Sequence, residues 1–312
     1  MANSINLVTK MLPLVDEIYR AEATTNILEA PAELVRETGN AKSYQIAKMA
    51  LDGFGNYDKD NGFPKGSASL TWETFTFEND RGKRFTIDRM DDVESFGLVA
   101  GRLVGDFTRD YLIPEVDAYR FAKIAANAPV AQTVTATLTK STAIDAVDEA
   151  IVTLQDNKVP MNRQILFVTP RIKKLLEQNI TRSTSNGEGN INRLIETYDT
   201  IPIVVVPQDR FYTAITLNAG TAASGAEPTW GYEKRQASGT GSSKIEAGEN
   251  INFLLMDRQA SVNITKLNIS KYFSPDENQN LDAHQFDFRM YGDSWVFDNK
   301  KAGIYVHKKA NA

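Results

Sequence analysis

Residues 70–127 constrain the fold most, because a strand pattern rich in aromatic residues leads there directly into one long helical pattern. In the first half, aromatic and aliphatic residues lie among threonines, which is typical of strands. In the second half, apolar residues recur every three or four positions, as expected for an amphipathic helix. The helical stripe comprises Val93, Phe96, Ala100, Leu103, Phe107 and Tyr111. This order indicates a structural building block rather than a catalyst.

Two features modify the expected helix. Pro114 has no amide hydrogen and disfavours a helical conformation at Ile113, so the helix is expected to kink or restart there. Gly97, Gly101 and Gly105 are spaced four residues apart, and each costs about 1 kcal/mol of helix stability relative to alanine. One interpretation is a groove where another segment's backbone approaches, or a helix soft enough to bend. The other is ordinary tight packing within one domain.

A further strand pattern, residues 43–49, precedes this run. Residues 52–67 between the two are polar and rich in glycine, so no hydrophobic core can be built from them. We expect the outer part of an extended loop whose two legs are paired strands. Residues 79–82, with the sequence NDRG, predict a tight reversal between the strand ending at Phe77 and the strand containing Phe85.

Beyond residue 130 the pattern changes to mixed strand and helix. Two continuous apolar runs, residues 165–168 and 203–206, predict buried strands. A helix is predicted before the first run, with an apolar stripe of Ile144, Val147, Ile151 and Leu154, and Ser141 or Thr142 is placed to cap it. This alternation indicates a central sheet with helices on both sides.

The second helix of this region is expected to begin at Pro170, because proline is favoured at the first helical position. Two polar insertions, residues 181–192 and 218–250, are expected to be surface loops. Further strands are predicted at residues 251–256, 260–269, 286–291, 294–298 and 303–307.

The N-terminal region carries apolar residues at helical spacing within residues 5–19, followed by a polar strap. The apolar face needs a surface, and the polar segment that follows cannot supply one. We therefore expect this arm to lie across a neighbouring subunit, with packing on its own domain as the alternative.

Composition narrows the possible functions. The 312 residues include no cysteine, which excludes disulfides, thiolate nucleophiles and cysteine metal sites. No apolar stretch approaches about 18 residues, so no membrane span is predicted. A net charge of -5 argues against a protein that wraps nucleic acid, since such a protein needs basic clusters.

Few residues suggest chemistry. His284 lies near Asp282 and Asp287 in the sequence, but a strand-edge histidine beside solvated carboxylates is the commoner case. His307 precedes two lysines and is expected at a solvated end, and neither histidine has an evident partner. Residues 239–244 resemble a phosphate-binding loop only superficially. We predict no catalytic, cofactor-binding or metal-binding residue, no cofactor and no enzyme activity.

Carboxylates cluster just before the long helix, at Asp88, Asp91 and Asp92. Negative charge is favoured at the positive end of the helix dipole. Capping of the helix is sufficient to explain these three residues.

The order of arm, projecting loop, long helix and mixed domain resembles that of tailed-bacteriophage major capsid proteins, whose Hong Kong 97 type fold is shared with encapsulins. Three stretches carry the resemblance: LTWETFTFENDRGKRFTIDRMDDVES at 70–95, DYLIPEVDAYRFAKIA at 110–125 and NRQILFVTPRIKKLLEQ at 162–178. They are similar to the return leg of the loop, the spine helix and a strand-helix unit of the axial domain. The fold class implied is α+β.

The resemblance implies five parts. These are an N-terminal arm (residues 1–42), an extended loop with its strand legs (43–90), the spine helix of a peripheral domain (91–130), a mixed α/β axial domain (131–260), and the return strands of the peripheral domain with a C-terminal strand (261–312).

It also implies a structural protein that assembles into pentamers and hexamers of an icosahedral phage head around double-stranded DNA. The expected partners are other copies of the chain, a scaffolding protein, a portal protein, a decoration protein, and the enclosed DNA through weak non-specific contact. No membrane partner is expected. The expected location is the virion capsid, with the host cytoplasm during assembly.

Charged residues of the loop and of the start of the spine are expected to meet opposite charges of neighbouring subunits. They are Lys59, Lys65, Arg81, Lys83, Arg84 and Glu94. Some capsid proteins of this type join subunits by an isopeptide bond from a loop lysine, and Lys65 lies at a similar place. No matching asparagine and glutamate are evident, so non-covalent cohesion is expected.

Two alternatives remain open. The same fold is found in encapsulin-like nanocompartments, which hold an enzyme instead of a genome. A chain of another class, a soluble α/β enzyme with residues 52–67 as a lid, lacks a recognisable arrangement of nucleophile and base.

Overall fold

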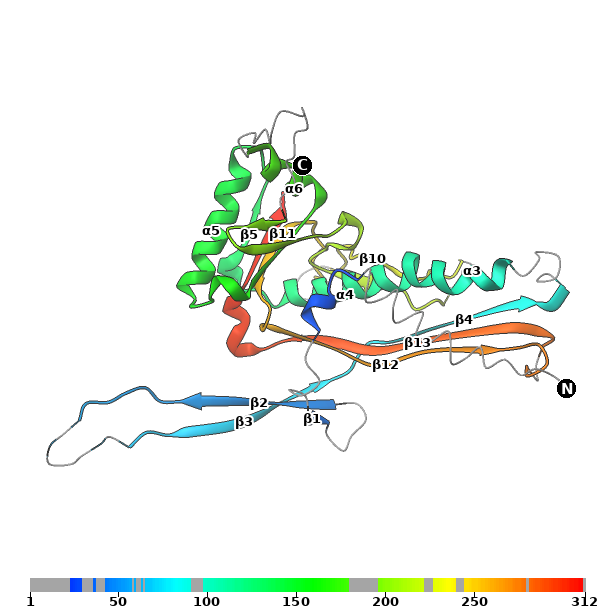
Figure 1. Ribbon diagram of the computed structural model, residues 1–312, viewed down its shortest axis with the longest axis horizontal. Coiled ribbons are helices and arrows are strands. Elements are labelled where there is room, and N and C mark those ends of the chain that lie inside the picture. Colours follow the sequence, from blue (N-terminus) through cyan, green and yellow to red (C-terminus); the bar gives the residue numbers. More distant parts are fainter. Residues whose placement is uncertain are drawn as a thin grey trace, which may run out of the picture.

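The computed structural model describes residues 23–29, 36–37, 43–57, 59, 63, 65–90, 98–179, 196–221, 227–239, 244–278 and 281–310. These residues form a six-stranded sheet flanked by helices, a long three-stranded sheet, and a ribbon of strands that projects from the body (Figure 1). The architecture is α+β, as the sequence predicts.

The six-stranded sheet is mixed and has the order β5-β14-β11-β6-β8-β7. Its strands are β5 (Thr133–Ala136), β14 (Ile304–Lys309), β11 (Ile251–Asp257), β6 (Gln164–Val168), β8 (Ile201–Val205) and β7 (Thr197–Tyr198). The β5-β14 and β6-β8 pairs are parallel and the others are antiparallel. The C-terminal strand β14 thus lies inside this sheet, together with strands from residues 131–260.

Both faces of this sheet are covered, which confirms the predicted central sheet. Along β6, Leu166 belongs to the core under α5 (Thr142–Asp156) and α6 (Pro170–Asn179). Its neighbour Phe167 belongs to the core on the opposite face. Successive side chains of a strand point to opposite faces, so a strand buried on both faces is apolar throughout.

The three-stranded sheet has the order β12-β13-β4 and is built from β12 (Ser261–Phe273), β13 (Ala283–Val296) and β4 (Asp80–Asp88). Strand β13 is continuous, whereas the sequence predicts two strands separated near Gly292. The break is absent because β12 shifts its register between Thr265 and Leu267 opposite Gly292. A side chain at Gly292 would meet the Ile264 carbonyl oxygen at 2.7 Å, so glycine allows the two strands to stay paired.

The predicted reversal at residues 79–82 is wrong. Arg81 and Gly82 lie within β4 and pair with Met290 and Arg289 of β13. Strand β3 (Ala68–Thr76) pairs instead with β2 (Ser43–Leu51). The chain therefore passes from the ribbon to the body at this point, because β4 finds its partner in a strand about 200 residues further on.

The long helix joins the two sheets. It consists of α3 (Leu98–Phe107), a π-helical turn (Thr108–Leu112) and α4 (Ile113–Ala126), with Pro114 in the first turn of α4. Ile113 keeps helical angles of φ -62° and ψ -49°, so the helix does not break at Pro114, and the predicted irregularity takes the form of the π-helical turn just before it. Helix α3 packs on β4 and β13, and α4 ends in the core of the six-stranded sheet, so the helix runs along both (Figure 1).

The π-helical turn changes which residues face the core. Leu103 and Phe107 pack on the three-stranded sheet as the stripe predicts. The prediction that Tyr111 also faces the core is wrong, since this residue is 64% exposed. A π-helical turn accommodates an extra residue, so the buried position moves to Thr108 and then to Ile113. Val93, Phe96 and Gly97 lie outside the described residues.

Smaller elements complete the description. Strand β1 (Arg36–Glu37) pairs with β2, and β9 (Ile215–Leu217) pairs with β10 (Tyr232–Lys234). Short 3₁₀ helices occur at Asn26–Leu28, Val130–Gln132, Met161–Arg163, Gln208–Arg210 and Asp298–Gly303. Strand β10 lies within residues 218–250, which were expected to be a loop; Tyr232 packs against α4 and orders it.

The expected cap of α5 also differs. Ser141 has helical backbone angles of φ -74° and ψ -33° and makes no capping hydrogen bond, since a capping residue is normally extended. The Thr142 hydroxyl accepts a hydrogen bond from the Thr139 amide at 2.9 Å instead. The helix beginning at Pro170 is confirmed.

Candidate functional site

The projecting ribbon presents an apolar face to solvent. Met49 of β2 lies directly opposite Leu70 of β3, and Leu51 lies opposite Ala68. Trp72 lies on the same face of β3 as Leu70, because side chains two residues apart share a face. The exposed fractions are 65% for Met49, 68% for Leu51, 55% for Leu70 and 45% for Trp72. We call these four residues the ribbon face.

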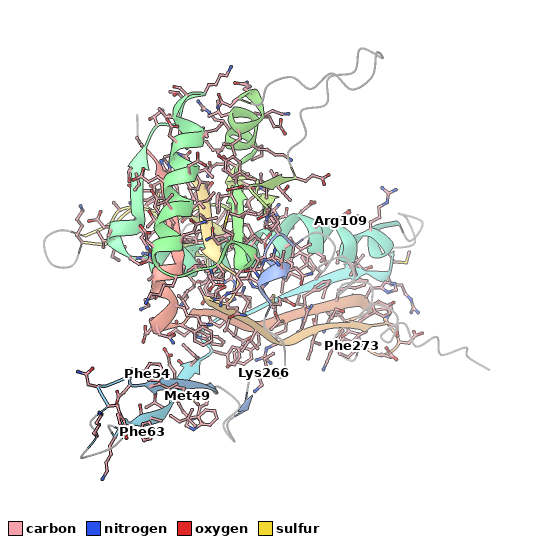
Figure 2. The ribbon with its side chains drawn as sticks, turned by 60° about the vertical axis from the view of Figure 1, so that its left-hand side comes forward. Met49, Phe54, Phe63, Arg109, Lys266 and Phe273 are labelled. Carbon is pink, nitrogen blue, oxygen red and sulfur yellow. The ribbon has the colours of Figure 1, made fainter. Side chains whose placement is uncertain are left out.

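The apolar surface continues to the tip of the ribbon. Phe54, Tyr57 and Phe63 are exposed there, and the Tyr57 and Phe63 rings meet edge to face at 5.1 Å. The Asp52 carboxylate accepts hydrogen bonds from the amide and hydroxyl of Ser67, both at 2.7 Å, and these bonds hold the pKa of Asp52 below its usual value. Figure 2 shows Met49, Phe54 and Phe63 together on this part of the chain, away from the body.

The base of the ribbon is fixed to the body by aromatic contacts. The Phe75 ring lies 5.4 Å from that of Trp295, and the Phe77 ring lies 4.9 Å from it. Phe75 points to the face of β3 opposite to that of Leu70 and Trp72. Thus Phe75 holds one face of the ribbon to its own chain, and the other face carries the exposed side chains of Met49, Leu51 and Leu70.

An isolated two-stranded ribbon is at best marginally stable in water, and exposed apolar patches of this kind mark interaction surfaces. The pairing of β2 with β3 confirms the predicted extended loop with paired legs, and the exposed apolar side chains of its outer part form a candidate interaction surface.

Five of the six predicted contact residues fall into three groups. Lys59 and Lys65 are exposed near the ribbon tip. Arg81 and Arg84 already have acidic partners in their own chain: Arg81 lies 2.6 Å from Glu115, and Arg84 lies 2.7 Å from Asp287. Glu94 lies outside the described residues. An intersubunit role for these residues stays a prediction.

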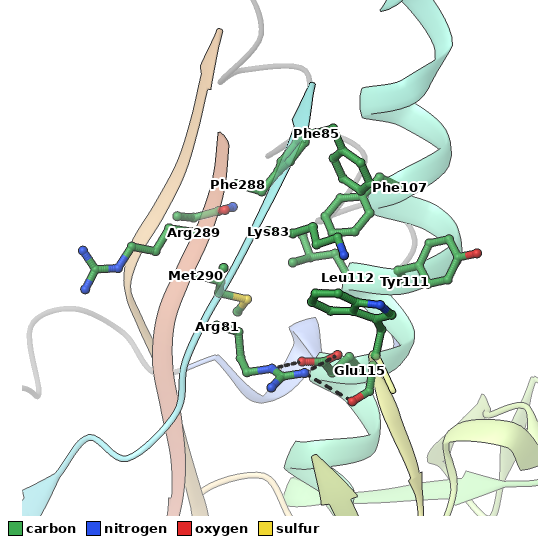
Figure 3. A pocket seen from close by; sticks show the side chains of 14 residues that line it. Arg81, Lys83, Phe85, Phe107, Tyr111, Leu112, Glu115, Phe288, Arg289 and Met290 are labelled. Atoms are coloured by element: carbon green, nitrogen blue, oxygen red, sulfur yellow. Dashed lines mark hydrogen bonds and ion pairs between the residues drawn. The ribbon is translucent and has the colours of Figure 1, made fainter. Parts of the chain in front are cut away.

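Lys83 has a different environment. Its ammonium lies 3.0 Å from the ring centroid of Trp230, a cation-π contact, and burial lowers the pKa of Lys83. It belongs to the wall of a cavity of about 320 Å³ between β4, β13 and the π-helical turn (Figure 3).

A buried polar network, which the sequence did not reveal, fixes the segment that precedes the ribbon. The Asp117 carboxylate of α4 accepts hydrogen bonds from the amides of Thr24 and Thr25, both at 3.1 Å. It also accepts from the Thr24 hydroxyl at 2.8 Å and the Thr25 hydroxyl at 2.6 Å. Arg210 lies 3.4 Å from this carboxylate. The only signal in the sequence was an aspartate on the buried side of a helix.

Residues 23–29 consequently pack on their own chain, where Leu28 joins the core beside Phe121. This part of the predicted N-terminal arm therefore packs on its own chain, which was the alternative to a contact with a neighbouring subunit. Residues 5–19 lie outside the described residues, so their predicted contact with a neighbour stays a prediction.

The two histidines have partners, contrary to expectation. His307 is 1% exposed, stacks on Phe253 at 4.9 Å and lies 3.1 Å from the Asn252 amide nitrogen. It is buried because β14 is paired on both edges, and burial lowers its pKa to about 4. His284 Nδ1 lies 2.7 Å from the Tyr272 hydroxyl.

Other predicted residues are placed only in part. Asp88 accepts a hydrogen bond from the Met90 amide at 2.8 Å, whereas Asp91 and Asp92 lie outside the described residues. Of the loop at 239–244, Lys244 pairs with Glu246. Within the described ranges, no cluster of three or more acidic or histidine side chains could hold a metal ion. No helix among these residues is long and apolar enough to span a bilayer.

Solved structures that are similar to the chain include phage capsids. The chain is similar to the mature capsid of bacteriophage PhiM1, with 14% identity, a TM-score of 0.56 and coverage of 88% of this chain and 84% of that one. The capsid of cyanophage P-SCSP1u gives 14% identity, a TM-score of 0.56 and coverage of 89% and 86%. The chain has the Hong Kong 97 type capsid fold.

The Hong Kong 97 type fold is also found in a virus-like particle from Pyrococcus furiosus. That structure shares 8% identity with this chain at a TM-score of 0.52, and the match covers 97% of this chain and all of the other, 100%. No protein-family model matches the chain, and no curated protein matches its sequence. In the terms of this fold, the ribbon is the extended loop, and α3 and α4 form the spine helix.

Proposed function

We propose that the chain is a phage major capsid protein, a structural subunit that assembles into pentamers and hexamers of an icosahedral head around double-stranded DNA. The observation that carries the proposal is the exposed side of the ribbon: in a chain whose fold is found in capsids, the apolar side chains of Met49, Leu51 and Leu70 are 55–68% exposed among the described residues.

Assembly would cover this face with a neighbouring copy. Burial of one large apolar side chain stabilises by about 1.5–3 kcal/mol relative to exposure. The ribbon face and tip together therefore supply a substantial favourable free energy at each contact. Exposed ion pairs add only about 0–1 kcal/mol each, so they would contribute more to the orientation of neighbouring subunits than to the stability of the contact.

The further partners follow from this proposal. They are a scaffolding protein and a portal protein during assembly, a decoration protein on the finished head, and packaged DNA through weak non-specific contact. The subunit would be made in the host cytoplasm and would end in the virion. Its role is mechanical and involves no enzyme activity.

Electron microscopy of the recombinant protein, alone and co-expressed with its scaffolding protein, tests the proposal. We expect closed shells with pentamers and hexamers. A chain that stays monomeric under every assembly condition, including co-expression, would contradict it.

An encapsulin-like nanocompartment is the second candidate, because the match to the Pyrococcus furiosus particle covers nearly all of both chains. The contents of particles isolated from the native source distinguish the two. Packaged double-stranded DNA of genome length supports the phage head, whereas a protein cargo without a genome supports the nanocompartment.

A further inference from the structure

The cavity beside the spine helix has mostly apolar walls. Phe85 and Phe288 come from the three-stranded sheet, Phe107 and Leu112 come from the spine helix, and Trp230 closes one side. Figure 3 shows the labelled rings of Phe85 and Phe107 and the side chain of Leu112 around the opening. Its volume of about 320 Å³ suits apolar side chains of a peptide segment.

Trp230 is held in place as a wall of the cavity. Gly220 has a φ of +70°, and a side chain there would come within 2.0 Å of the Trp230 ring. Glycine at this position therefore makes room for the indole. Arg81 strengthens the same wall, because its guanidinium donates to the carbonyl oxygens of Asn218 at 2.8 Å and Gly231 at 3.2 Å.

Of the basic side chains around the cavity, two form ion pairs with carboxylates of the described chain and one does not. Arg81 pairs with Glu115, and Arg289 pairs with Asp80 at 2.7 Å. Among the residues that the structure describes, no carboxylate pairs with the ammonium of Lys83. An occupant that combines apolar side chains with a carboxylate would complement both features.

The described N-terminal segment begins beside this cavity. Ala23 is buried in one cluster with Ile113, Val116 and Met290, and Leu112 packs against that cluster. Leu112 and Met290 also line the cavity. The chain that precedes Ala23 therefore starts next to the cavity wall.

The sequence of that preceding segment has the required chemistry. Residues 5–19 carry the apolar stripe described above, and Asp16 and Glu17 lie within it. Tyr19 is four residues from Ala23, so it lies within about 14 Å of it even if the chain is fully extended. A tether this short gives an effective concentration of the order of millimolar.

We propose that the cavity is the docking site of the chain's own N-terminal segment, residues 5–19, with its apolar side chains against the apolar walls of the cavity and its carboxylates on Lys83. This differs from the expectation that the segment lies on a neighbouring subunit. It does not depend on shell assembly, so it can be true or false whatever the fate of the proposed capsid function.

Disulfide trapping tests the proposal, and the absence of cysteine in the natural chain removes any background. The variant carries Leu14→Cys in the segment and Tyr111→Cys at the cavity rim. The matched control carries Leu14→Cys and Val152→Cys, since Val152 is similarly exposed on α5, at 55% against 64% for Tyr111. Both are oxidised as unassembled protein and digested for mass spectrometry.

We expect a disulfide within one chain for the Tyr111 pair and none for the Val152 pair. Dilution with a twentyfold excess of cysteine-free chain should leave its yield unchanged. Equal trapping of both pairs, or no trapping at Tyr111, would overturn the proposal. Trapping only as a dimer that dilution abolishes would also overturn it, and would place the segment on a second copy.

A charge exchange tests the role of Lys83 separately. Asp16→Lys with Glu17→Lys should lower the yield of the Leu14–Tyr111 disulfide severalfold, and Lys83→Glu in addition should restore it. Lys83→Arg, which keeps the charge, should leave the yield unchanged. If the exchange does not restore the yield, Lys83 does not receive the segment's carboxylates and that part of the proposal fails.

Discussion

His307 and Asp117 are two buried polar side chains that the sequence gives no reason to place in the interior. His307 lies on β14, between β5 and β11 of the six-stranded sheet, where it stacks on Phe253. Asp117 lies on the buried side of α4, where it receives the amides of Thr24 and Thr25. Each joins parts of the chain that are far apart in sequence, and each therefore carries a measurable share of stability.

The buried His307 predicts a pH-dependent loss of stability. Desolvation lowers its pKa from 6.5 in the unfolded chain to about 4 in the folded one. Between these values the unfolded chain binds the proton and the folded chain does not, so the free energy of unfolding falls as the pH falls from about 6.5 to about 4. The contribution is about 3 kcal/mol.

Urea unfolding of the natural chain and of His307→Phe at pH 7.5 and pH 4 measures this contribution. Phenylalanine keeps the ring stack, and Asn252 still donates to the carbonyl oxygens of Ala136 and Lys308. We expect the variant to lose about 3 kcal/mol less than the natural chain over this range. An identical loss in both proteins would show that His307 does not titrate in this way.

Removal of the Asp117 carboxylate should destabilise the protein strongly. Asp117→Ala leaves Arg210 and two backbone amides without their buried acceptor, and breaking such a pair typically costs about 3–5 kcal/mol. Asp106→Ala, at an exposed position of α3, should change the free energy of unfolding by less than about 0.5 kcal/mol. Similar unfolding curves for the two variants would contradict the role of Asp117.

Among the elements, the spine helix does most to define the architecture, because it runs along both sheets. Its π-helical turn lies between the parts that pack on each, immediately before Pro114. Gly105 lies in the last turns of α3, and a side chain built there meets nothing within 4 Å. Tight packing inside the described chain thus does not explain this glycine.

Gly105→Ala should consequently stabilise the isolated subunit. Alanine favours a helix interior by about 1 kcal/mol over glycine, and the site has room for the methyl group. Thermal unfolding of the unassembled protein measures the effect, with the shell yield recorded in parallel. A lower stability of the isolated subunit would mean that another part of the chain lies against Gly105.

For the whole molecule, the ribbon is what distinguishes a subunit from a self-sufficient domain. Its base is anchored on Trp295, while Met49, Leu51, Leu70 and Trp72 face solvent. In a monomeric protein, exposed apolar side chains contribute no stability. In an assembled subunit, their burial against a neighbouring copy would stabilise the contact between subunits.

Leu70→Ser and Val152→Ser provide a matched test, because both side chains are 55% exposed in the single chain. Neither change should alter the unfolding of the isolated subunit by more than about 0.5 kcal/mol. Leu70→Ser should reduce shell formation, measured by sedimentation and electron microscopy, while Val152→Ser should not. Equal yields would show that the ribbon face is not covered on assembly.

The strands of the ribbon, the stripe of α5 and the buried strand β6 were predictable because their signals are local. The alternation of side chains along a strand and their spacing along a helix are written in neighbouring residues. Pro170 acted through its own ring and marked the start of α6, and Pro114 marked the change from the π-helical turn to α4. The same holds for the order of the elements, which led to the resemblance with capsid proteins.

The failures share another cause. The NDRG sequence at residues 79–82 has the composition of a turn, yet it lies in a strand because β13 supplies a partner. His307 resembles a solvated terminus, yet pairing with β5 and β11 buries it. The network at Asp117 joins residues more than 90 positions apart. Local propensity is worth about 1 kcal/mol or less per residue, so such long-range pairing overrides it.

By itself, the sequence determined the strands of the ribbon, the helices that begin near Pro114 and Pro170, the buried strand β6, and that a polar, glycine-rich loop projects from the body. Only the tertiary structure decided which strands pair, which polar groups are buried, and which face of the ribbon is left to solvent. The physical reason is that side-chain periodicity depends only on residues that are neighbours in the chain. Burial depends on which distant segments pack together, and no single segment determines the free energy of that packing.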